Sequence, residues 1–148
     1  MSGERNGLEE REEQLRTGGD VRLVVPASPE YLRLVRLTAA GLASRLGFTF
    51  DEVEDLRIAV DELCFHLLGD ADDGASNPSG AQDEDRTMDL VYSAGSDSIT
   101  ITGRTGLSGS IPEPSDLSEQ ILDALVDEHE VIGDDGMITF RLKKQRES

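Results

Sequence analysis

The spacing of apolar residues predicts three helices along the chain. The first covers residues 29–46, with Ser28 as its N-cap and Pro29 at its first helical position, and it ends at a glycine at position 47. Its predicted main apolar face consists of Tyr31, Leu34, Val35, Thr38 and Leu42. The second starts at a capping box formed by Thr49 and Glu52 and runs to residue 68. Its predicted buried stripe consists of Val53, Leu56, Val60, Leu63 and Leu67. The third is capped at position 115 or 116. Its predicted inward side chains are Leu117, Ile121, Leu122, Leu125 and Val126.

Alternating apolar and polar residues predict five strands, at 21–25, 88–93, 98–102, 130–132 and 137–143. Two hairpins pair four of these strands, with turns at 94–97 and 133–136. Together with the helices, the order of elements is β-α-α-β-β-α-β-β. This order predicts an α/β two-layer sandwich with a mixed, largely antiparallel sheet and three helices packed on one face.

The remaining segments are polar or rich in glycine, which predicts irregular structure. Residues 1–19 are expected to be a disordered leader, residues 20–144 the folded domain and residues 145–148 a tail. Long loops are expected at 69–86 and 103–114. No apolar run is long enough to cross a bilayer and the N-terminus has no signal-peptide core, so we expect a cytoplasmic protein without membrane contact.

The chain is strongly acidic, with 31 acidic and 14 basic residues and a net charge of −17. Such a charge repels phosphate backbones and argues against nucleic-acid binding. It suits a basic protein partner, although charge alone favours the simpler interpretation of a merely acidic, soluble protein. The single cysteine, Cys64, falls in the apolar part of the second helix and is interpreted as a buried structural thiol.

Candidate chemistry centres on Glu62 and His66, which lie one turn apart on one face of the second helix. The segment 58–64, Ile-Ala-Val-Asp-Glu-Leu-Cys, resembles the histidine-kinase-like ATPase domain (Bergerat fold). It is most similar to the anti-sigma factors and serine-protein kinases of bacterial partner-switching systems. The segments 25–32 (Val-Pro-Ala-Ser-Pro-Glu-Tyr-Leu) and 125–128 (Leu-Val-Asp-Glu) match as well. The resemblance spans about residues 21–144.

This resemblance implies that Glu62 stands at the position of the general base. His66 replaces the asparagine that holds Mg²⁺ in the family, and imidazole is a poor ligand for that hard ion. In the motif that reads adenine, Thr102 replaces the aspartate and Arg104 the first glycine, which leaves Gly106 as the match.

The third nucleotide element of the family is a glycine-rich turn before the last helix. Here residues 115–119, Ser-Asp-Leu-Ser-Glu, lack glycine and carry two carboxylates that would repel phosphate. The resemblance therefore implies a degenerate nucleotide site. We expect no cofactor, with ATP and Mg²⁺ retained only if the site has been remodelled. No metal site is expected, and His129 is interpreted as a surface residue.

Glycines at 103, 106 and 109 are interpreted as belonging to an ordinary loop rather than a phosphate cradle. Arg33 and Arg36, at i and i+3 on the first helix, are candidates for partner binding, with solvated helix charge as an even alternative.

The resemblance implies a homodimeric anti-sigma factor of the stress-response type. It would sequester an alternative sigma factor and be released by an anti-anti-sigma protein of the STAS class. The alternatives are an active Mg-ATP-dependent serine-protein kinase acting on that protein, with Glu62 as base, or an acidic scaffold unrelated to sigma factors.

Overall fold

The computed structural model describes residues 20–68, 86–106 and 115–147, with the backbone alone for residues 66 and 67. The predicted leader at 1–19, most of the predicted loop at 69–86 and residues 107–114 lie outside the described residues. The described elements are β1 (Asp20–Pro26), a 3-10 turn η1 (Pro29–Tyr31), α2 (Leu32–Arg45), α3 (Phe50–Leu68), β2 (Thr87–Ala94), β3 (Ser98–Gly106), α5 (Asp116–Leu125), β4 (Glu128–Asp134) and β5 (Met137–Gln145).

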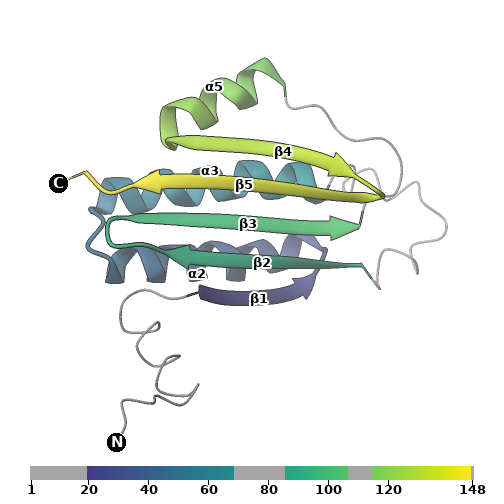
Figure 1. The fold of residues 1–148 in the computed structure, drawn as a ribbon, viewed down its shortest axis with the longest axis horizontal. Helices are drawn as coiled ribbons and strands as arrows, with labels where there is room; N and C mark the ends of the chain where they lie inside the picture. Colours follow the sequence, from purple (N-terminus) through teal and green to yellow (C-terminus); the bar gives the residue numbers. More distant parts are fainter. Residues whose placement is uncertain (1–19, 69–85, 107–114, 148) are drawn as a thin grey trace, which may run out of the picture.

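The predicted two-layer α/β sandwich is confirmed. The five strands form one sheet in the order β1-β2-β3-β5-β4, and helices α2 and α3 cover one of its faces (Figure 1). Helix α5 lies at the β4 edge and contacts α3. All four strand pairings are antiparallel, so the parallel component of the predicted mixed sheet does not occur among the described strands.

Two predicted helix boundaries rest on local backbone chemistry that the structure confirms. At the start of α3, the Thr49 amide donates to Glu52 Oε1 (2.7 Å) and the Glu52 amide donates to Thr49 Oγ1 (3.1 Å), which is a complete capping box. After α2, Gly47 has φ +88°, a left-handed conformation that favours glycine. At the start of the first helix, Pro29 opens a 3-10 turn, and the Ser28 side chain makes no capping hydrogen bond.

The core lies between the sheet and α2 and α3. The predicted stripe of α3 is confirmed for its described side chains, Val53, Leu56, Val60 and Leu63, and Cys64 is fully buried as expected. They pack against the inward side chains of the central strands, which are Met88, Leu90, Tyr92, Ile99, Ile101, Ile138, Phe140 and Leu142. Tyr92 Oη donates to the Val35 carbonyl (3.0 Å) and so fastens β2 to α2.

Several predicted boundaries and orientations are wrong. Strand β3 continues through residues 103–106, which were predicted to begin a loop. Backbone pairing with residues 137–140 of β5 keeps this glycine-containing segment in the sheet. The turn between β4 and β5 is confined to Asp135 and Gly136, both with positive φ, as in a two-residue type I′ hairpin. Leu117, predicted to point inward, is 67% exposed, and Leu34, assigned to the apolar face of the first helix, is 45% exposed.

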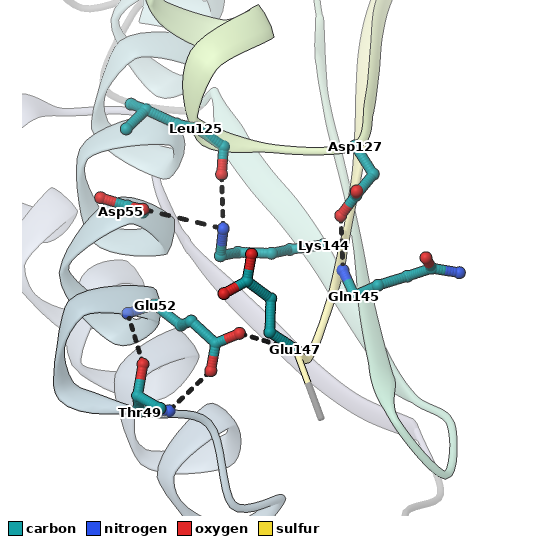
Figure 2. Close-up of polar contacts among 8 residues, drawn as sticks. All are labelled: Thr49, Glu52, Asp55, Leu125, Asp127, Lys144, Gln145 and Glu147. Carbon is teal, nitrogen blue, oxygen red and sulfur yellow. Dashed lines mark hydrogen bonds and ion pairs between the residues drawn. The ribbon is translucent and has the colours of Figure 1, made fainter.

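The segment beyond residue 144 is attached to the fold. Gln145 ends β5, and its amide donates to Asp127 Oδ2 (2.7 Å). Next to it, Arg146 donates from its guanidinium to the Leu46 carbonyl (3.2 Å), and the Glu147 amide donates to Glu52 Oε2 (2.7 Å). The end of the chain thereby joins the N-terminus of α3 to the rest of the domain (Figure 2). None of the described helices has the length and apolarity that crossing a bilayer requires.

Candidate nucleotide and partner site

Glu62, at the family's base position, joins α3 to α5. The Ser118 hydroxyl of α5 donates to Glu62 Oε2 at 2.7 Å, and the Ser118 residue is only 2% exposed. A hydrogen bond from a neutral donor to a carboxylate is stronger than a hydrogen bond between two neutral groups. This contact connects residues 56 positions apart in the chain. Glu62 is therefore part of a helix–helix contact, a role that its spacing from His66 did not indicate.

The N-terminus of α5 is capped by hydrogen bonds between neighbouring residues of the same segment. Of the two predicted cap positions, Ser115 is the N-cap, and its hydroxyl accepts a hydrogen bond from the Ser118 amide (3.0 Å). Its carbonyl accepts from the Glu119 amide (3.0 Å). Asp116 and Glu119 add two carboxylates to the first turn, where the helix dipole favours negative charge. A phosphate at this helix end would meet both carboxylates and an amide that already has a partner.

His66 lies in the last turn of α3, and its side chain is outside the described residues. Its relation to Glu62 stays a prediction. Within residues 20–68, 86–106 and 115–147, no three histidine, cysteine, aspartate or glutamate side chains are placed to hold a metal ion.

The two substituted residues of the adenine motif lie on the sheet face away from the helices. Side chains alternate along β3, and the buried positions are those of Ile101, Gly103 and Thr105. Thr102 and Arg104 therefore point to the opposite face, where Thr102 is aligned with Val91 and Arg141 of the neighbouring strands. The structure does not bring Thr102 and Arg104 together with Glu62, which faces α5 in the helix layer.

The glycines of β3 have different roles. A Cβ on Gly103 would come within 2.5 Å of the Phe140 ring, so the absent side chain makes room for a buried aromatic residue. Gly106 has no atom within 4 Å of such a Cβ, and its carbonyl accepts a long hydrogen bond from Arg86 (3.5 Å). Gly103 thus has a packing function, and Gly109 lies outside the described residues.

The two candidate partner-binding arginines differ in their surroundings. Arg36 is part-buried and donates to Asp61 Oδ1 at 2.6 Å, which joins α2 to α3. Arg33 is exposed to solvent. The pair predicted from i, i+3 spacing therefore divides into one arginine that holds two helices together and one that is available to a partner.

The outer surface of the helix layer carries apolar side chains that the sequence analysis missed. Leu34 and Leu37 of α2 and Ile58 and Phe65 of α3 are all about half exposed. Ile58 and Phe65 are seven residues apart and so lie on one stripe of α3. Helix α2 also contains three arginines and no acidic residue, in a chain of net charge −17. The exposure of Leu34 and Leu37 was hidden because the apolar positions of α2 continue around both of its faces.

A second group of polar contacts surrounds the end of β5 (Figure 2). Lys144 is mostly buried, and its Nζ donates to the Leu125 carbonyl at the C-terminus of α5 (2.6 Å). It also lies 3.9 Å from Asp55 Oδ2 of α3. His129, expected to be a free surface residue, is only 16% exposed at its side chain and lies 2.6 Å from Asp123 of α5. These contacts hold α5 in place from the sheet side.

No protein-family model matches this chain. The serine-protein kinase RsbW of Halalkalibacterium halodurans is 34% identical over 133 residues, which cover 83% of this chain and 82% of that protein. RsbW of Bacillus velezensis is 40% identical over 79 residues, and RsbW of Bacillus subtilis is 57% identical over 48 residues. The chain spans 49% and 30% of the lengths of these two relatives.

Two solved structures are similar in fold. The first is the structure of the RsbU and RsbW domains of Rv1364c from Mycobacterium tuberculosis. It aligns with 86% of this chain at a TM-score of 0.60 and 13% identity, and the alignment covers 32% of that chain. The SiaB-SiaC complex from Pseudomonas aeruginosa aligns with 95% of this chain and 98% of the matched chain, at a TM-score of 0.50 and 12% identity.

Proposed function

We propose that this chain, which belongs to the RsbW family of partner-switching anti-sigma factors and serine-protein kinases, is an anti-sigma factor that acts by binding alone. In this proposal it sequesters an alternative sigma factor in the cytoplasm and blocks access to core RNA polymerase. An anti-anti-sigma protein of the STAS class releases the sigma factor by competing for an overlapping surface. The protein acts as a homodimer.

The observation that carries this proposal is the hydrogen bond between Ser118 and Glu62. A general base must reach the proton that it removes. Here one carboxylate oxygen at the base position is taken by a buried hydroxyl of the protein itself, in a contact that joins two helices. This arrangement favours a structural role for Glu62 over proton abstraction from a partner serine.

The surroundings of the other nucleotide positions support the same interpretation. The first turn of α5 carries Asp116 and Glu119, and its Ser118 amide is bonded to the Ser115 hydroxyl. Thr102 and Arg104 face away from the helix layer. These surroundings favour regulation by binding over nucleotide chemistry.

The outer face of α2 is the proposed sigma-factor surface. Leu34 and Leu37 supply exposed apolar area, and Arg33 supplies an exposed guanidinium suited to a partner carboxylate. Arg36 supports this surface from within through Asp61.

The test is transcription with purified components. Each alternative sigma factor of the host is mixed with core polymerase and this protein, and promoter-specific transcripts are measured before and after addition of a STAS-class protein. We expect inhibition of one sigma factor and recovery on addition of its STAS antagonist. Arg33→Glu should weaken inhibition, whereas Arg104→Glu, an equal charge reversal on the opposite face, should not. Unchanged transcription with every sigma factor would refute the proposal.

A further inference from the structure

Helix α5 is fixed by polar contacts near its two ends and by the contact of Asp123 with His129, and Leu122 is the one apolar side chain of the helix that is fully buried in the core. Its buried residues are Ser118 and Leu122, while Leu117 is exposed and Ile121 and Leu125 are half-buried. In contrast, α3 contributes a continuous buried stripe to the main core. An element with few buried apolar contacts opens at a lower free-energy cost than the core.

Near its N-terminus, α5 is attached to α3 through the side chain of Ser118. Ser118 Oγ donates to Glu62 Oε2 (2.7 Å). The cap of the helix lies within the same segment, because the Ser115 hydroxyl accepts from the Ser118 amide. Breaking the contact with Glu62 therefore leaves the helix cap intact.

The C-terminal attachment is more extensive. Lys144 Nζ donates to the Leu125 carbonyl (2.6 Å), where a cation also interacts favourably with the helix dipole. Immediately after the helix, the Asp127 amide donates to the Lys143 carbonyl (2.9 Å). Figure 2 shows that Asp127 Oδ2 also accepts from the Gln145 amide (2.7 Å). These contacts hold residues 125–127 on β5.

We propose that α5 opens as a unit while the domain stays folded, with the Ser118–Glu62 hydrogen bond as its latch and residues 125–127 as its hinge. Opening separates the N-terminal half of α5 from α3 and frees the Glu62 carboxylate from Ser118. Any partner that prefers the open or the closed position shifts this equilibrium by its differential affinity. The inference concerns the free protein and holds whether or not a sigma factor is the partner.

Hydrogen exchange measured by mass spectrometry, over a series of low urea concentrations, tests this inference on the full chain. Amides of α5 should exchange through an opening with a small urea dependence, because little surface is exposed. Amides of β2 and β3 should exchange with the larger dependence of global unfolding. Equal urea dependence in both regions would show that α5 opens only with the whole domain.

Two hydroxyl deletions identify the latch. Ser118→Ala removes the latch from the closed state, so amides of α5 should exchange about tenfold faster. Tyr92→Phe removes a buried hydrogen bond between β2 and α2, which the open form of α5 keeps. It should therefore accelerate exchange in the core and leave α5 unchanged. Acceleration of α5 by Tyr92→Phe, or unchanged α5 exchange in Ser118→Ala, would overturn the proposal.

Discussion

Replacing Gly103 by alanine tests the packing of the central strands. In β3, Gly103 is aligned with Phe140 of β5, and a Cβ at position 103 would lie 2.5 Å from Cε2, 2.9 Å from Cζ and 3.1 Å from Cδ2 of that ring. Real Cβ atoms do not approach a ring carbon to 2.5 Å, and Phe140 is completely buried, so the ring must move within a filled core. Overpacking of this kind costs about 1–3 kcal/mol.

A second effect opposes this cost. Alanine restricts the unfolded chain more than glycine does, which stabilises the fold by about 0.4–1 kcal/mol where the backbone conformation is compatible. The expected net loss in the free energy of unfolding for Gly103→Ala is therefore about 1–2 kcal/mol. For a domain of this size, such a loss lowers Tm by about 4–8 °C.

Urea unfolding followed by circular dichroism measures this loss, and Gly106→Ala is the matched control. Gly106 lies in the same strand, has no positive φ and has no atom within 4 Å of an added Cβ. Its alanine variant should be as stable as the unaltered protein or slightly more stable. Phe140→Leu should lower the free energy of unfolding less in the Gly103→Ala variant than in the unaltered protein, because the smaller side chain removes the overlap with the added Cβ. A Gly103→Ala variant as stable as Gly106→Ala would refute the reasoning.

Two further predictions concern ionisable groups. Hydrogen bonds from the amides of Glu147 and Thr49 hold the pKa of Glu52 below its ordinary value. This lowered pKa stabilises the fold above the unfolded-state pKa of about 4.3, and the stabilisation is lost as the pH falls through the folded-state pKa. Glu52→Gln should therefore flatten the acid side of a stability-versus-pH curve from urea titrations, and an unchanged slope would contradict this. Burial raises the pKa of the Cys64 thiol to about 12. Cys64 should react with a thiol reagent at pH 8 at least about a thousandfold more slowly than in the urea-unfolded chain, and comparable rates would show that it is accessible.

Local sequence signals predicted the parts of the fold that depend on neighbouring residues. The capping box of Thr49 and Glu52, the left-handed Gly47 and the Ser115 cap of α5 all involve residues within one helical turn. The stripe of α3 was equally visible, because its apolar residues recur at helical spacing along one face. The two-layer architecture followed from the order of these elements.

The errors occurred where long-range pairing outweighs local composition. Residues 103–106 are rich in residues typical of turns, yet ladder pairing with β5 keeps them in β3. That extension places Arg104 in the strand, on the same side of the sheet as Thr102, since side chains alternate along a strand. The comparison of Thr102 and Arg104 with a nucleotide motif used their spacing in the sequence, and it did not consider the side of the sheet on which their side chains lie.

Contacts between residues far apart in the chain could not be predicted from the sequence either. The bonds from Ser118 to Glu62, from Arg36 to Asp61 and from Lys144 to Leu125 join residues 56, 25 and 19 positions apart. The type of each residue does not reveal which distant group it contacts. Packing of helices in three dimensions decides that these particular groups meet.

The central claim, regulation by binding without nucleotide chemistry, is tested most directly by calorimetric titration with Mg-ATP. RsbW of Halalkalibacterium halodurans is titrated in parallel as the related serine-protein kinase. We predict that this protein gives no binding heat at millimolar Mg-ATP and transfers no labelled phosphoryl group to a STAS-class protein that releases its sigma factor. Micromolar binding of Mg-ATP together with transfer of label, both lost in Glu62→Ala, would contradict the account and establish the protein as an active kinase.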